Sequence, residues 1–204
     1  MLKTSAQSEQ GHEEDALAAG STKRKIVLAV LETVAEVGVE GATARAIAAK
    51  GGFNQALIFY HFGGSNQVLL AALDLSSIRR LAGYRLMLQE AQEPSEVIRR
   101  SKILFEEDLS TGHVRLLLGM LSKSLSDPEL AEEMSDRIDP WLALAQEAIE
   151  RIFPSTSGIA GIPTEPLATA MVALYVGLDA LAHLASGKER IAEMFAATGA
   201  LLHG

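Results

Sequence analysis

The sequence predicts an all-α fold, in which three short N-terminal helices are joined by a long helix to a larger helical domain. Apolar residues recur at spacings of three and four along most of the chain, and no convincing strand alternation appears. Glycine and proline pairs divide the chain into segments of helical length. Hydrophobic residues make up 48% of the 204 residues, which is enough for a sizeable core.

Glycines and N-cap residues divide the N-terminal part of the chain into predicted segments. Residues 1–20 are polar and acidic without periodicity, which predicts a disordered tail. Residues 23–37 form a helix with one apolar face, ended by Gly38 and Gly41. Thr43 is an N-cap for a short helix over residues 44–50, and Asn54 is one for a third helix over residues 55–60.

The later segments are all helical. Ser65 can cap a long helix that reaches about residue 89, and Pro94 opens the next helix at its first position. Pro140 is expected to kink or split the helix that begins after Asp127, because it lacks a backbone N–H. A loop is expected at 154–163. The remaining predicted helices cover residues 94–109, 113–125, 128–153, 165–186 and 188–202.

Composition excludes several classes of protein. The chain has no cysteine, so it can form neither disulfides nor thiolate metal sites. No apolar run approaches the roughly 18–20 residues of a membrane span, and the N-terminus lacks the apolar region of a secretory signal. We therefore expect a soluble cytoplasmic protein without a membrane partner. No metal-binding spacing, cofactor motif or nucleophile motif is present, so we expect no cofactor, no metal and no enzymatic activity.

Charge is distributed unevenly. The net charge is -8, which argues against general affinity for nucleic acids. Residues 21–62, however, hold five basic side chains against three acidic ones, inside an otherwise acidic chain.

This basic segment coincides with a possible helix-turn-helix. Ala48, Gly52 and Ile58 supply the small residue at the helix crossing, the turn glycine and the branched apolar residue of such a unit, with Ile47 and Phe53 filling the wedge.

The same segment resembles a known family. The stretches "GFNQALIFYHF" and "GGSNQVLLAAL", with the opening "KRKIVLAVLETVAEVGVEGATARAIA", resemble the tetracycline-repressor (TetR) family. The resemblance implies a homodimeric transcriptional regulator, usually a repressor, that binds double-stranded operator DNA and is released by a small molecule. It also implies a DNA-binding domain at about 21–67 and a ligand-binding and dimerisation domain at 68–204.

Candidate DNA contacts follow from position and chemistry. A basic arm precedes the first helix, and the amide of Gln55 can pair with adenine while Ala56 and Leu57 touch thymine methyl groups. Tyr60 and His61 resemble the phosphate-contacting pair of the family, although a buried structural role is the alternative for Tyr60. Phe59 and Phe62 are assigned to the core. The full set of predicted contacts is Lys23, Arg24, Lys25, Thr43, Arg45, Asn54, Gln55, Ala56, Leu57, Tyr60, His61 and Ser65.

One position departs from the family. Members usually carry a lysine where this chain has Ser65, at the N-terminus of the long helix. The helix N-terminus and the Ser65 hydroxyl can still bind phosphate. One charged contact per subunit is lost, however, so we expect a shallower salt dependence of DNA binding.

The C-terminal two-thirds is expected to hold a dimer interface and a ligand pocket. The helix over 165–186 has two apolar stripes, so it must be buried on two sides, and either stripe can face a partner. The predicted interface residues are Leu167, Met171, Leu174, Leu178, Asp179, Leu181 and His183. Asp179 and His183 are expected to form a buried hydrogen-bonded pair, with ligand or metal binding as the alternative.

The predicted pocket residues are Phe105, Leu109, Leu116, Met120, Met134, Trp141 and Tyr175, for a mostly apolar or aromatic ligand. Asp108, His113 and Arg115 are polar neighbours that are expected to be solvated.

Two other interpretations remain open at this stage. The chain could be a helical interaction protein that has lost DNA binding, or an all-α enzyme. Sequence-selective, salt-dependent DNA binding would separate a regulator from both.

Overall fold

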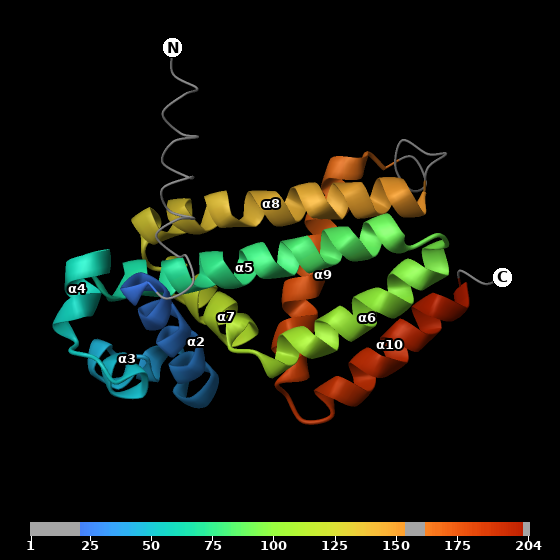
Figure 1. Cartoon of the computed structure of the whole chain (residues 1–204). Coiled ribbons are helices and arrows are strands. Elements are labelled where there is room, and N and C mark those ends of the chain that lie inside the picture. The colour runs from blue at the N-terminus through green and yellow to red at the C-terminus, as the bar shows by residue number, and fades with distance from the viewer. Residues whose placement is uncertain (1–20, 154–161, 202–204) are drawn as a thin grey trace, which may run out of the picture.

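The computed structural model describes residues 21–153 and 162–201, and within these ranges it is built from helices (Figure 1). The all-α prediction is therefore confirmed. The predicted disordered tail and most of the predicted loop at 154–163 lie outside the described residues. The described helices are α2 (Thr22–Gly41), α3 (Ala44–Gly51), α4 (Ala56–Phe62), α5 (Ser65–Glu90), α6 (Pro94–Ser110), α7 (His113–Ser124), α8 (Pro128–Ile152), α9 (Thr164–Ala182) and α10 (Gly187–Leu201).

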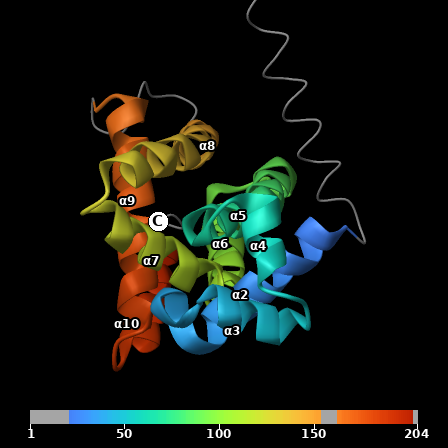
Figure 2. The same cartoon turned by 90° about the vertical axis from the view of Figure 1, so that its left-hand side faces the viewer.

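The three short helices α2, α3 and α4 gather at one end of the molecule (Figures 1 and 2). The helices α5 and α8 run side by side away from them, and α6 and α10 lie on the other side of α5. The helix α9 packs mainly on α8. The largest core cluster joins the three N-terminal helices to the rest of the chain, because Ile26 and Val30 of α2 and Leu69 and Leu73 of α5 belong to it together with Leu116 of α7.

Local sequence signals set most helix ends. The Ser21 hydroxyl accepts a hydrogen bond from the backbone N–H of Arg24, and the Asp127 carboxylate accepts one from Leu130, so both residues are N-caps. Gly38 interrupts α2 near its end with a φ of 74°. Pro140 does not split α8, which runs unbroken from Pro128 to Ile152. Packing along α8 against α5 and α9 evidently outweighs the one backbone hydrogen bond that Pro140 cannot make.

Candidate nucleic-acid interface and ligand cavity

The turn between α3 and α4 has the geometry that a helix-turn-helix requires. Gly52 has a φ of 65°, a left-handed conformation that favours glycine, and its N–H donates to the Ala48 carbonyl. Ala48 is 5% exposed and Ile58 is fully buried. Ile47 is also fully buried, and Phe53 packs against the same core. The predicted roles of these residues in joining the two helices are therefore confirmed.

A side chain caps α3, and a second side chain, just before α4, accepts a hydrogen bond from the first backbone N–H of that helix. The Thr43 hydroxyl accepts a hydrogen bond from the Ala46 N–H at 3.2 Å and remains exposed. The Asn54 side-chain oxygen accepts one from the Ala56 N–H at 2.9 Å. Gln55 itself occupies the N-cap position of α4 and makes no such bond, so the helix begins one residue later than predicted.

One face of α4 is open to solvent. Gln55 and Ala56 are exposed, whereas Leu57 and His61 are half-buried. Tyr60 is 82% exposed, which excludes the buried role considered for it. Phe59 is 51% exposed, so its assignment to the core was wrong. The physical reason is the length of α4, because a helix of seven residues buries only the narrow side that holds Ile58.

Basic side chains lie on the neighbouring helices α2 and α3. Lys25 and Arg45 are exposed, and Arg24 is half-buried. The Lys23 ammonium lies 6.0 Å from the centre of the Phe62 ring, at the outer limit of a cation–π contact. Among the residues that the structure describes, Lys25 and Arg45 have no ion-pair partner, so their charges are available to a phosphate.

The start of α5 differs from the prediction. Ser65 is the first residue of the helix, whereas Gly64 holds the N-cap position, and no side chain caps the helix. The prediction that Ser65 caps α5 was therefore wrong. Lys123 of α7 donates a hydrogen bond to the Asn66 side-chain oxygen at 3.1 Å. Its ammonium brings a cation to the start of α5, near the position where the family usually has a lysine, and sequence spacing alone could not reveal it.

An apolar cavity of about 340 Å³ lies between α5, α6, α8, α9 and α10. Of the seven predicted pocket residues, Phe105, Trp141 and Tyr175 line it. Leu109 is half-buried and borders a separate hollow between α6 and α10. The other three predicted residues are in the core cluster instead and do not line the cavity, namely Leu116, Met120 and Met134.

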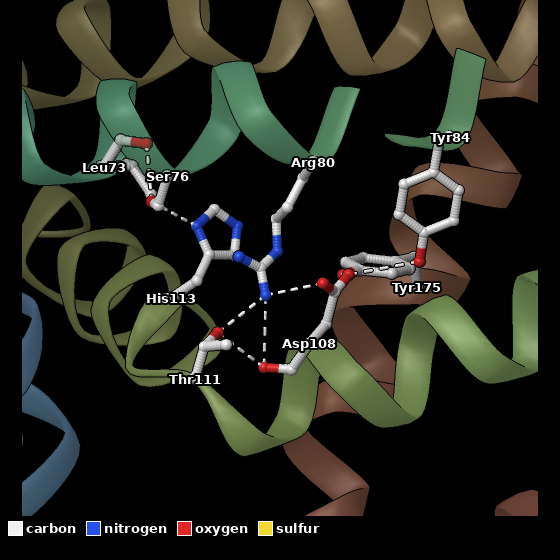
Figure 3. Close-up of polar contacts among 8 residues, drawn as sticks. All are labelled: Leu73, Ser76, Arg80, Tyr84, Asp108, Thr111, His113 and Tyr175. Carbon is white, nitrogen blue, oxygen red and sulfur yellow. Dashed lines mark hydrogen bonds and ion pairs between the residues drawn. The ribbon is translucent and has the colours of Figure 1, made fainter. Parts of the chain in front are cut away.

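A buried polar cluster lies behind the cavity wall (Figure 3). Arg80 of α5 and Asp108 of α6 form an ion pair at 2.6 Å, with side chains 9% and 8% exposed. Arg80 also donates to the Thr111 hydroxyl at 2.8 Å. The cavity-lining residues Tyr84 and Tyr175 both donate to Asp108 Oδ2, at 3.2 and 2.6 Å. The expectation that Asp108 is solvated was therefore wrong, because side chains of α5 and α9 enclose its carboxylate.

Burial dominates the titration of this cluster. It raises the pKa of the Asp108 carboxyl, while Arg80 and the two tyrosine hydroxyls act in the opposite direction. It also raises the pKa of both tyrosines, so their hydroxyls keep their protons at any physiological pH.

His113, at the start of α7, is also buried, with 1% of its surface exposed, rather than solvated as expected. Its Nδ1 lies 2.7 Å from the Ser76 hydroxyl oxygen, and that hydroxyl donates to the Leu73 carbonyl (Figure 3). The imidazole therefore carries its proton on Nδ1 and donates to Ser76, which leaves Nε2 without a hydrogen-bond partner among the described residues. Burial, aided by the charge of Arg80, lowers the pKa of His113 to about 3.

Asp179 of α9 is fully buried, and neither of its carboxylate oxygens has a hydrogen-bond partner in the described part of the chain. Burial and the charge of Asp108 raise its pKa to about 7, against the effect of Arg80. His183 is exposed, and its Nδ1 contacts the backbone oxygen of Asp179 at 2.8 Å. The predicted side-chain pair of Asp179 and His183 was therefore wrong, whereas the placement of both residues at a subunit interface stays a prediction.

The helix α9 keeps one apolar face open. Leu174 and Leu181 are 54% and 50% exposed, and Leu184, just beyond the end of the helix, is 63% exposed. The other predicted interface leucines and methionine, Leu167, Met171 and Leu178, are half-buried against their own chain. Over its 19 residues α9 is long and apolar enough to cross a membrane by length and composition alone, contrary to the expectation from sequence.

Three residues of the polar cluster escaped sequence reasoning. Ser76, Arg80 and Tyr84 are four residues apart, which places them on one face of α5. That spacing was a usable signal, because a polar stripe within a long core helix predicts buried partners on neighbouring helices.

The corner between α6 and α7 links this cluster to α2. A Cβ atom added at Gly112 would lie 2.4 Å from the Leu31 carbonyl oxygen and 3.3 Å from the Ala35 Cβ. Arg115, one turn into α7, donates a hydrogen bond to the Ala35 carbonyl. The start of α7 therefore rests directly on the backbone of α2, and Gly112 follows immediately after Thr111, which binds Arg80.

Gly112→Ala is expected to lower the free energy of unfolding by about 1–3 kcal/mol, because the methyl group meets a backbone oxygen that cannot rotate away. Urea denaturation measures this change. Gly83→Ala is the matched control, because a Cβ atom at Gly83 meets nothing within 4 Å on helix α5. That control should stabilise the protein by about 0.5–1 kcal/mol, through the higher helix propensity of alanine. Equal effects at the two glycines would contradict the close contact.

The exposed face of α4 and the turn at Gly52 form a helix-turn-helix unit. Residues 26–73 match the family model described as "Bacterial regulatory proteins, tetR family". Over these residues the chain is therefore similar to the helix-turn-helix DNA-binding domain of that family. A search of the curated proteins found no match.

Solved structures share the fold over most of the chain. A protein from Rhodococcus sp. described as a TetR-family transcriptional regulator has 19% sequence identity and a TM-score of 0.68, over 89% of this chain and 99% of that one. A described transcriptional regulator from Saccharomonospora viridis in complex with choline has 23% identity and a TM-score of 0.61, over 77% and 82%. The transcriptional regulator FadR from Bacillus subtilis in complex with stearoyl-CoA has 16% identity and a TM-score of 0.55, over 76% and 84%.

Proposed function

We propose that this protein is a cytoplasmic repressor that binds a palindromic operator as a homodimer and leaves it when a small, mostly apolar molecule enters the cavity. The observation that carries the proposal is the combination of two sites in one chain. An exposed α4 face with uncommitted basic neighbours lies at one end, and an apolar cavity lies between the helices that extend from it. The proposed division places DNA binding in residues 21–67 and ligand binding with dimerisation in residues 68–204.

The open face of α9 is the proposed dimer interface. Its exposed leucines at 174 and 181, and Leu184 just beyond its end, alternate with the small residues Ala173, Gly177 and Ala180, which are also exposed in the single chain. Two such faces can pack closely about a two-fold axis, and that symmetry matches a palindromic operator. The same apolar composition that makes α9 resemble a membrane span suits a helix held between two subunits.

The proposed coupling runs through the α6–α7 corner. A ligand that displaces Tyr84 or Tyr175 changes their hydrogen bonds to Asp108 at the end of α6. Gly112, two residues after the end of α6, lies against the backbone of α2. A shift of this corner therefore moves α2 and the helices α3 and α4 that follow it. A ligand that prefers the shifted state lowers DNA affinity by population shift.

A gel shift with the DNA upstream of the coding region, with competitor DNA and rising salt, tests the proposal. The expected result is a discrete complex that resists competitor and weakens as salt increases. Failure to select any sequence from a random DNA pool would overturn the proposal in favour of a helical interaction protein. Size-exclusion chromatography with light scattering tests the dimer separately.

Gln55→Ala and Lys25→Ala are expected to affect DNA binding differently. Loss of the Gln55 amide should cost about 1–3 kcal/mol on the operator and little on unrelated DNA. Loss of Lys25 should weaken both equally and reduce the salt slope by about one. Affinities at several salt concentrations measure both effects. Gln89→Ala and Lys188→Ala, which change exposed residues outside α2–α4, are the controls. Unchanged DNA binding in both test variants would contradict the assignment of Gln55 and Lys25 to the DNA-binding surface.

A further inference from the structure

The wall of the cavity holds an aromatic group made of four side chains, Tyr84, Phe105, Trp141 and Tyr175. The rings of Trp141 and Tyr175 are stacked with their centres 6.0 Å apart, and the Tyr84 ring meets that of Trp141 edge-on at 6.1 Å. The Phe105 and Tyr175 rings are 5.7 Å apart and nearly perpendicular. Ring faces carry partial negative charge, so a group of this kind attracts a cation within the cavity.

The tyrosine hydroxyls strengthen this preference. Both donate their protons to Asp108 Oδ2, away from the cavity-lining rings to which they belong (Figure 3). Each hydroxyl has a single proton, so toward a ligand Tyr84 and Tyr175 can offer only acceptor lone pairs. A carboxylate directly behind them makes those oxygens more negative. A ligand head group that donates hydrogen bonds or carries positive charge is favoured, and an acceptor-only head group is not.

Positive charges near the cavity are already paired. Arg80 is held by Asp108 and Thr111 and does not line the cavity. Arg137 is the one Lys or Arg among the described lining residues, and it binds both carboxylate oxygens of Asp74 at 2.7 and 2.9 Å. A carboxylate or phosphate ligand would therefore enter an apolar space without an uncommitted cation, at a large cost in lost hydration.

Asp179 lies one helical turn after Tyr175 on α9. Its carboxyl group is fully buried and has no hydrogen-bond partner in the described part of the chain. It interacts electrostatically with Tyr175, Asp108 and Arg80, so it belongs to the same cluster. Two acidic groups thus share one guanidinium. When Asp179 is ionised, the cluster carries one negative charge more than this guanidinium balances, and an unpaired buried carboxyl is rare enough in proteins to require an explanation.

We propose that the cavity recognises an apolar molecule with an ammonium head group, either a protonated amine or a quaternary ammonium, which sits against the Trp141–Tyr175 aromatic group and offsets the negative charge of the unpaired Asp179 carboxyl behind it. The inference rests on the proposed ligand-responsive function and specifies the chemical class of the ligand. The apolar remainder of the molecule fills the space lined by residues such as Leu88, Ile152 and Met171.

The single tryptophan makes the test direct. Trp141 is the only tryptophan in the chain and lines the cavity, so its fluorescence reports cavity occupancy. We would titrate the full-length protein with decyltrimethylammonium, decanol and decanoate, which share a ten-carbon chain and differ in head-group charge. The two ionic compounds are kept below their micelle concentrations, and decanol is kept below its solubility limit. The expected order places the ammonium at least about tenfold tighter than the alcohol, a difference of about 1.4 kcal/mol, and decanoate weakest. Equal or tighter binding of decanoate or decanol, or no response to any of the three, would overturn the proposal.

Two Asp→Asn variants test whether the Asp179 carboxyl causes the preference for the ammonium compound over the alcohol. Asp179→Asn should reduce the preference for the ammonium over the alcohol by about tenfold and leave decanol affinity unchanged. Asp136→Asn, the same chemical change at an exposed position of α8, should leave the preference intact. An unchanged preference in Asp179→Asn would contradict the role of that carboxyl. The comparison of head groups in the wild-type protein does not depend on how well any variant folds.

The gel shift separates this inference from the proposed function. Release of DNA by decanoate or decanol but not by the ammonium would keep a ligand-responsive repressor and reject the ammonium class. Absence of any selective DNA complex would reject the repressor, whereas the fluorescence order would still decide the ligand class.

Discussion

Asp179→Asn is expected to make the protein lose stability as the pH falls from 7 to 4, a range in which the titrations of Asp179 and His113 largely cancel in the wild-type protein. Asp179 has a pKa raised from 3.8 to about 7, so its contribution to stability is fully present below pH 3.8 and is lost as the pH rises through 7. His113 has a pKa lowered from 6.5 to about 3, so its contribution is present above pH 6.5 and is lost as the pH falls toward 3. The two effects have opposite signs in the same pH window.

The size of the effect follows from the pKa shifts. One pKa unit corresponds to about 1.4 kcal/mol. Between pH 7 and pH 4 the protonation of Asp179 adds about 4 kcal/mol to the free energy of unfolding, and the resistance of His113 to protonation removes about 3 kcal/mol. The variant keeps only the second effect, so it should lose about 3 kcal/mol over this range. Urea denaturation at several pH values, with Asp136→Asn as control, measures the difference. Parallel profiles for wild type and Asp179→Asn would contradict the buried titration.

The helix-turn-helix was predictable because its determinants are local. Ala48, Gly52 and Ile58 act within ten residues of each other, and the cap at Thr43 binds the N–H group three residues later. Such spacings do not depend on how the rest of the chain folds. The error at Phe59 has a physical source as well. A seven-residue helix has too little contact area to bury all its aromatic residues, and only the packing of α4 shows which ones remain outside.

The polar cluster was not predictable, because it assembles side chains from distant helices. Asp108 lies 28 residues from Arg80 and 67 from Tyr175 along the chain, and each separately resembles an ordinary surface or core residue. The same limit applies to the predicted pocket residues Leu116, Met120 and Met134. An apolar residue of a middle helix can line a cavity or fill the core, and only the relative rotation of the helices decides between them.

Arg80→Leu is expected to lower the free energy of unfolding at pH 7 by about 3–5 kcal/mol, as removal of one partner from a buried ion pair does. The Asp108 carboxylate would stay buried with only the hydroxyls of Tyr84 and Tyr175 to stabilise it. Urea denaturation measures the loss. Arg79→Leu changes the neighbouring exposed arginine of the same helix and should stay within about 0.5 kcal/mol of wild type.

A second substitution and a change of pH identify the uncompensated charge as the cause. Asp108→Asn combined with Arg80→Leu keeps an oxygen acceptor for the tyrosines and removes the buried charge, so the double variant should be more stable than Arg80→Leu alone. Arg80 opposes the effect of burial on the Asp108 pKa, so without it that pKa rises further. The defect of Arg80→Leu should therefore shrink as the pH falls and Asp108 takes up a proton. A defect that is independent of pH and unrelieved by Asp108→Asn would instead mean that Arg80 contributes through packing of its side chain, and the negative charge assigned to the cavity wall would then rest on Asp179 alone.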